Sequence, residues 1–159
     1  FSPLKDSAVP ACDAVWLPGG YPELHANVLG ANHALRASLA QHIAHNKPVW
    51  AECGGMMVLF ETLIDADGQR HEMLGLLPLV TSYATRKRHL GYRRLHSLAP
   101  GLFEGGFTAH EFHYSTIVSE GAADRLFEAE DALGEKLGAV SIDGEFVSCE
   151  IDPLPMSSA

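Results

Sequence analysis

Cys53 is the residue whose setting points most directly to chemistry. It follows residues 48–52, an apolar run typical of a buried strand, and precedes Gly54, Gly55 and an apolar segment of helical character. A residue on such a strand-to-helix turn is pushed out beyond the sheet edge, and the glycines remove Cβ atoms that would clash in the bend. The dipole of the following helix favours a thiolate. The pattern indicates a nucleophilic cysteine; an inert cysteine in a tight loop would share it.

A second glycine pair, Gly19 and Gly20, follows the apolar run at residues 14–17. The carboxyl ends of parallel strands meet at one edge of a sheet, so both glycine turns are expected there. A thiolate that attacks an amide needs N–H donors for the developing oxyanion, and turns without side chains present them well. We therefore expect Gly20 and Gly54 to form the oxyanion hole, although ordinary loops also contain such pairs.

The elements that must position these turns alternate between strand and helix. Residues 13–17 and 48–52 are expected to be strands, and residues 55–63 a helix. A longer helix is expected over residues 29–45, ending before Asn46 and Pro48. This order implies an α/β fold in which a mostly parallel sheet has helices on both faces.

The second half of the chain alternates more and contains more Gly and Pro, so it is expected to be rich in strands. A turn is expected at residues 65–69, and the tail 151–159 is expected to be disordered, which leaves a single domain over residues 1–150. The further expected elements are strands at 73–80, 90–97, 107–118 and 138–149, and a helix at 122–133.

Composition and charge exclude several classes of function. The formal charge of −9 over 159 residues argues against nucleic acid as a partner, since no basic surplus neutralises phosphates. Cys12, Cys53 and Cys149 have no ligand-like spacing, so we expect no metal site and a reducing, cytoplasmic location. No apolar run is long enough to span a membrane.

Three segments in this order carry a family resemblance: residues 17–23 (LPGGYPE), 51–56 (AECGGM) and 110–115 (HEFHYS). Together they resemble the class I glutamine amidotransferase domain of the cobyrinic and hydrogenobyrinic acid a,c-diamide synthases, and residues 90–94 resemble that family's Gly-Tyr-Arg strand. The resemblance covers about residues 1–147. It implies a class I, flavodoxin-like fold and a cysteine nucleophile at Cys53.

The resemblance also implies a division of labour. In this family an N-terminal synthetase domain binds ATP and Mg²⁺ and phosphorylates tetrapyrrole carboxylates, while the C-terminal domain hydrolyses L-glutamine and supplies the ammonia. The chain contains no Gly-x-x-x-x-Gly-Lys-Ser/Thr motif, so no cofactor is expected here and the synthetase domain is an expected partner. The expected enzyme is a glutamine-dependent carbon–nitrogen ligase of cobalamin biosynthesis.

The start of the chain departs from the family pattern. Phe1 is not an initiator methionine, and the first strand and helix of the family domain are missing, so an N-terminally truncated piece is expected. A parallel sheet needs both faces covered. We therefore expect Val15 and Leu17 to be exposed on one side.

The end of the chain departs in its chemistry. The family's general base lies in a segment resembling Ser-Phe-x-His, but residues 145–150 read EFVSCE and no histidine follows His113. Without a base, turnover should fall by orders of magnitude. An impaired relic or binding module with this fold is therefore the alternative function. A cysteine peptidase of related fold would share the elbow but not residues 110–115.

The resemblance places His113, Glu111 and Tyr114 in the glutamine pocket or partner surface, with His113 as a possible substitute base. A basic cluster lies nearby and is interpreted as a docking site for the partner domain or an anionic substrate, or as a solvated loop. Its members are Arg86, Lys87, Arg88, His89, Arg93 and Arg94.

Overall fold

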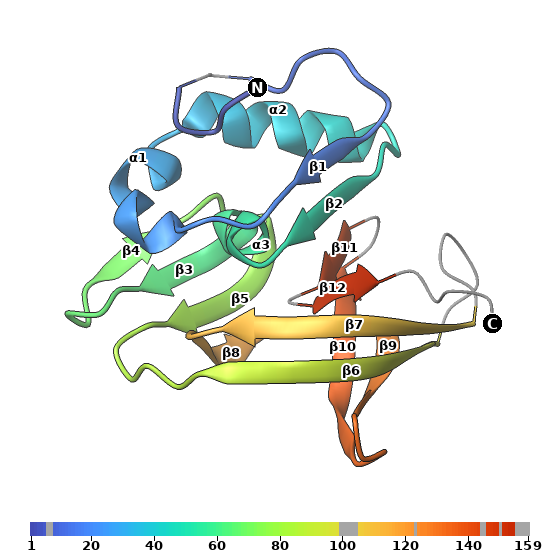
Figure 1. Ribbon diagram of the computed structural model, residues 1–159. Coiled ribbons are helices and arrows are strands. Elements are labelled where there is room, and N and C mark those ends of the chain that lie inside the picture. Colours follow the sequence, from blue (N-terminus) through green and yellow to red (C-terminus); the bar gives the residue numbers. More distant parts are fainter. Residues whose placement is uncertain (6–7, 99–104, 123, 144–145, 150, 155–159) are drawn as a thin grey trace.

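The computed structural model describes residues 1–5, 8–98, 105–122, 124–143, 146–149 and 151–154, whose strands form two sheets (Figure 1). The larger sheet has the order β1 (Val15–Leu17), β2 (Val49–Glu52), β11 (Phe146–Cys149), β10 (Lys136–Asp143), β9 (Asp124–Asp131), β6 (His89–Ser97), β7 (Gly106–His113) and β12 (Ile151–Leu154). The smaller sheet has the order β4 (Arg70–Glu72), β3 (Phe60–Ile64), β5 (Leu77–Ser82) and β8 (Thr116–Glu120). The helices are the 3₁₀ turn η1 (Pro22–Leu24), α1 (Ala26–Gly30), α2 (His33–Ala44) and α3 (Gly54–Leu59).

Fewer strands pair in parallel than we expected for a mostly parallel sheet. It joins β1 to β2, β2 to β11 and β3 to β5, and every other described pairing is antiparallel. The strand-rich second half is confirmed. β9 and β10 are antiparallel because a tight turn joins them, and the φ of 85° at Gly134 suits that turn.

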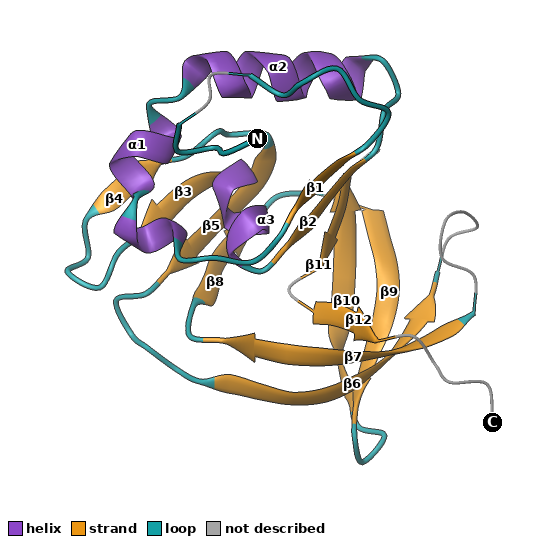
Figure 2. Ribbon diagram, turned by 45° about the horizontal axis from the view of Figure 1, so that its top comes forward, coloured by secondary structure: helices purple, strands orange, loops and turns teal. Residues whose placement is uncertain are grey.

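The helices pack on one face of the β1–β2 pair (Figure 2). Val15 and Leu17 are only 3% and 4% exposed, and they share a core with Leu35 and Leu39 of α2 and with α3. The expectation that Val15 and Leu17 would be exposed is therefore wrong. The opposite face of β1 instead carries Trp16, which is 64% exposed, so helices do not cover both faces here.

Two expected helices are replaced in part or wholly by strands. α3 ends at Leu59, and the segment expected to continue it forms β3, whose Thr62 and Leu63 are buried between β4 and β5. Residues 122–133 contribute β9 instead of a helix, because their apolar side chains, Leu126 among them, are buried where β9 lies between β6 and β10. Tertiary pairing overrides local propensity in both places.

The expected helix at 29–45 is broken near its start. α1 ends at Gly30, and α2 begins after Asn32, whose side chain accepts a hydrogen bond from the Leu35 N–H as an N-cap. Within the described residues, no helix is both long and apolar enough to cross a membrane.

The tail differs from the expectation of disorder beginning at residue 151. Ile151–Leu154 forms β12, antiparallel to β7, because β7 would otherwise present an unpaired edge. Pro153 suits this edge position, where its missing N–H interrupts no central ladder. Residues 155–159, also expected to be disordered, lie outside the described residues.

Candidate functional site

Cys53 joins β2 to α3 through a sharply bent backbone. Its φ of 46° and ψ of −119° are unfavourable for a residue with a side chain, and such conformations cost about 1–3 kcal/mol and concentrate at functional sites. Its carbonyl accepts the N–H groups of Met56 and Met57 at 3.1 and 3.2 Å, which anchors the first turn of α3. The predicted strand–cysteine–helix elbow is therefore confirmed, and the role of Cys53 as a nucleophile stays a prediction.

The two glycine turns touch, as the sequence predicted. A Cβ added to Gly54 would lie less than 3.0 Å from the Gly20 carbonyl oxygen, and one added to Gly55 would overlap the Leu17 carbonyl. A Cβ on Gly19 would lie 3.9 Å from the Cys53 sulfur, whereas one on Gly20 would meet open space. This close approach requires glycine in α3 and brings the backbone of the first loop against the nucleophile turn.

An apolar hollow of about 320 Å³ adjoins the elbow. Its volume falls in the range of small-molecule pockets, and its lining is largely hydrophobic and aromatic. Both glycine turns and the start of the chain contribute to it. The lining includes Phe1, Trp16, Gly20, Tyr21, Gly54 and Val58.

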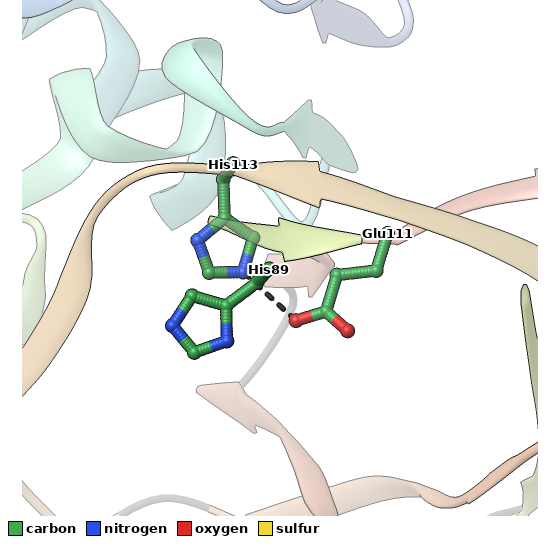
Figure 3. Close-up of side chains that lie close together, drawn as sticks. All are labelled: His89, Glu111 and His113. Carbon is green, nitrogen blue, oxygen red and sulfur yellow. Dashed lines mark hydrogen bonds and ion pairs between the residues drawn. The ribbon is translucent and has the colours of Figure 1, made fainter. Parts of the chain in front are cut away.

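A separate cluster of polar side chains lies on β6 and β7, where His89, Glu111 and His113 converge (Figure 3). The rings of His89 and His113 stack with centroids 4.6 Å apart and planes inclined by 10°. His113 Nε2 lies 2.9 Å from Glu111 Oε1, and Arg93 donates to Glu111 Oε2 from Nε at 2.7 Å. Hydrogen bonding with His113, and then with Arg93, lowers the pKa of Glu111 to about 2.

The sequence found only part of this group. Glu111, His113 and Tyr114 were expected in the glutamine pocket or on the partner surface. Glu111 and His113 contact each other, whereas Tyr114 is 43% exposed and packs edge-on against Phe112. His89 and Arg93 had been interpreted as members of a surface basic cluster. The register of β6 and β7 brings them to this cluster: His89 lies opposite His113, and Gly91 lies opposite Glu111.

The His113 ring is held at both nitrogens. Nδ1 lies 3.0 Å from the Ser115 carbonyl oxygen and Nε2 faces Glu111, and the side chain is buried. These contacts suit a residue that organises its surroundings. A general base would need a lone pair directed at a reacting proton.

The C-terminal segment runs beside the nucleophile strand. β11 pairs in parallel with β2, which sets Ser148 opposite Ala51 and Cys149 opposite Glu52. By the Ser-Phe-x-His pattern, Ser148 stands where the family's histidine would be. The segment in which a histidine was expected therefore pairs with the strand that precedes Cys53.

Comparison with known proteins gave consistent matches. Residues 1–149 match the model of the CobB/CobQ-like glutamine amidotransferase domain. Similar curated proteins include hydrogenobyrinate a,c-diamide synthases from Sinorhizobium sp, 56% identical over 89% of this chain and 33% of theirs, and from Brucella abortus, 51% identical over 92% and 35%. The chain thus spans about a third of the length of these relatives. A solved structure titled as a glutamine amidotransferase has a TM-score of 0.55 at 14% identity, covering 87% of this chain and 69% of its own, which supports the fold alone.

Proposed function

Because the chain belongs to the CobB/CobQ-like glutamine amidotransferase domain family, we propose that it hydrolyses L-glutamine to generate ammonia. The ammonia would serve an ATP-dependent a,c-diamide synthase acting on cobyrinic or hydrogenobyrinic acid in cobalamin biosynthesis. The observation that carries the proposal is the strained Cys53 elbow packed against the Gly19–Gly20 turn. A cytoplasmic location stays a prediction from the cysteine content.

The chemistry follows from this arrangement. The Cys53 sulfur attacks the side-chain amide carbon of glutamine, and the backbone N–H groups of Gly20 and Gly54 hold the oxyanion. The C–N bond then breaks, and ammonia leaves with the proton taken from the thiol. Water hydrolyses the resulting thioester, which releases glutamate and restores the cysteine.

In this mechanism, proton transfer is the step that lacks the histidine expected from the family pattern. General acid–base groups contribute about 10²–10⁴-fold to such reactions, and Ser148 cannot replace an imidazole. His113 remains the candidate substitute, although its two ring nitrogens already face Ser115 and Glu111. An impaired relic or binding module is the second candidate function, and the serine at position 148 favours it.

Glutamate release tests the proposal and separates these candidates. We expect slow release by the chain as it stands, none by Cys53→Ala, and about 10²-fold faster release by Ser148→His, which returns the imidazole beside β2. Cys12→Ser is the matched control and should behave like the parent. Release unaffected by Cys53→Ala would refute the proposal, and loss of robust parental activity in His113→Ala would identify His113 as the base.

We further propose that the partner is an ATP-binding synthetase domain, which would hold ATP and Mg²⁺ and the tetrapyrrole carboxylate. The supporting surface is the outer face of β6 and β7, defined here by Leu90, Tyr92 and Phe112, which are 50%, 64% and 50% exposed. Leu90 and Phe112 are direct cross-strand neighbours, so the apolar surface is continuous. Exposed aromatic residues beside cations such as Arg94 are typical of protein interfaces.

A further inference from the structure

We propose that His89, Glu111 and His113 form a binding site for a divalent transition-metal ion, best suited to Zn²⁺. Each side chain offers one ligand atom, and these three atoms lie within 4.8 Å of one another. One ring nitrogen of His89 faces Glu111 and the Nε2 side of His113 (Figure 3). The site goes beyond glutamine hydrolysis, which does not require a metal in the mechanism above.

Both ring nitrogens of His113 face hydrogen-bond acceptors, whereas a neutral ring carries only one hydrogen. The Ser115 carbonyl can only accept, so the Nδ1 that lies 3.0 Å from it must carry the hydrogen. If the ring carries only this hydrogen, Nε2 presents a lone pair to Glu111 Oε1 at 2.9 Å. Two lone pairs at this distance repel unless a cation joins them, and that cation is either a proton or a metal ion.

The surroundings match those of metal-binding histidines. Such a histidine almost always donates its second ring N–H to a carbonyl or carboxylate, as His113 does to Ser115, and its carboxylate neighbours are themselves hydrogen-bonded. Arg93 holds Glu111 through Oε2, which leaves Oε1 directed at His113. A Cβ on Gly91 would lie 2.5 Å from the Arg93 guanidinium, so glycine makes room for this bridge.

His89 completes the set of ligands. Its ring stacks on that of His113, which sets one of its nitrogens beside Glu111. Its Nε2 is buried without a hydrogen-bond partner. The ring can therefore turn and move inward without breaking a hydrogen bond at Nε2.

The donor set selects the kind of ion. Two imidazoles and one carboxylate with an open fourth position are typical of Zn²⁺, whereas Mg²⁺ and Ca²⁺ prefer oxygen ligands alone. Bonds of about 2.0–2.1 Å in a tetrahedral site place ligand atoms roughly 3.4 Å apart. We therefore expect His89 to approach His113 and Glu111 when the ion binds.

Titration with Zn²⁺ alone, and with Co²⁺ as a spectroscopic substitute, tests the site. The untagged chain should carry Cys53→Ser, so that the elbow thiol does not compete. We expect one equivalent of Zn²⁺ and the visible absorption of four-coordinate Co²⁺. His89→Ala, Glu111→Gln and His113→Asn should each weaken Zn²⁺ binding by more than about 100-fold, beyond the range for outer-shell changes.

His110→Asn is the matched control, because His110 lies on the same strand but packs against Tyr92 on the opposite face. It should leave Zn²⁺ affinity unchanged. Equal affinity of the His110 and His89 variants would overturn the site, as would absence of one-to-one binding. Nitrogen NMR showing both His113 ring nitrogens protonated in excess Zn²⁺ would assign the position between His113 and Glu111 to a proton and also overturn it.

Discussion

At the scale of single residues, a glycine cannot be replaced where another backbone segment lies too close for a Cβ atom. Gly54 abuts the Gly20 carbonyl, while an added Cβ at Gly20 meets open space and Gly20 has no positive φ. The two members of the expected oxyanion hole therefore differ in tolerance. Packing requires glycine at position 54, whereas the residue at position 20 only has to present its backbone N–H.

Gly54→Ala should destabilise the fold and displace the elbow. The new methyl would overlap the Gly20 carbonyl oxygen, and overpacking of this kind costs about 1–3 kcal/mol. Urea unfolding measures the free-energy change. Gly20→Ala, which keeps the backbone N–H, should stay within about 0.5 kcal/mol of the parent. Equal destabilisation by both substitutions would show that the two turns do not meet as described.

The sequence predicted the elbow because its signal is local: a strand, a cysteine and two glycines in succession. It could not predict that His89 lies on His113, because strand register depends on pairing between segments separated by the residues that connect β6 to β7. The same limitation made Arg93 look like part of a solvated cluster, when it is bound to Glu111.

At the scale of elements, a turn between β3 and β4 is anchored by one carboxylate. Asp65 Oδ1 accepts the N–H groups of Asp67 and Gln69, and Oδ2 lies 2.7 Å from His71 Nε2. His71 Nδ1 in turn contacts Asn27 of α1 at 3.0 Å. The turn expected at residues 65–69 is therefore confirmed, and His71 links it to a helix.

The stability of this turn should depend on pH. The hydrogen bond from His71, more than those from Gln69 and Asp67, lowers the pKa of Asp65 in the folded chain. The stabilisation is thus complete above the ordinary carboxyl pKa and is lost as pH falls through the lowered one. Asp65→Asn should flatten the loss of stability that thermal unfolding shows as pH falls below the ordinary carboxyl pKa. The exposed neighbour in Asp67→Asn should leave the profile unchanged, and an identical flattening there would contradict this assignment.

Prediction of elements succeeded where caps and turns are local. Asn46 has a φ of 57° and follows α2, as expected of a helix terminus. It failed where tertiary pairing decides, as in β9, which looked helical in isolation but lies between β6 and β10. The parallel pairing of β11 with β2 joins segments about 100 residues apart and had no local signal.

At the scale of the whole molecule, large apolar side chains are exposed at several places among the described residues. They include Trp16 on β1, the strand that ends the larger sheet, and those on the outer face of β6 and β7. The relatives are about three times as long as this chain. The relatives are thus long enough to hold the proposed partner domain, and the outer face of β6 and β7 is where we propose that it docks.

Tyr92→Ala combined with Phe112→Ala should weaken docking to the N-terminal two thirds of a relative such as the Sinorhizobium synthase. Truncation of an aromatic hot spot at an interface costs about 2 kcal/mol or more, so we expect at least about 10-fold weaker binding by calorimetry. Val28→Ala, on α1 and 52% exposed, is the matched control. Unchanged affinity in the double variant would place the interface elsewhere.

The proposed hydrolysis of glutamine depends on Cys53 being the nucleophile. The most direct measurement is the rate at which a glutamine-mimicking electrophile modifies each cysteine of the native chain, read by mass spectrometry. We predict that Cys53 reacts at least about 10-fold faster than Cys12 or Cys149 and that L-glutamine slows its modification. Equal rates at the three cysteines, or modification of Cys53 that glutamine does not slow, would contradict the account.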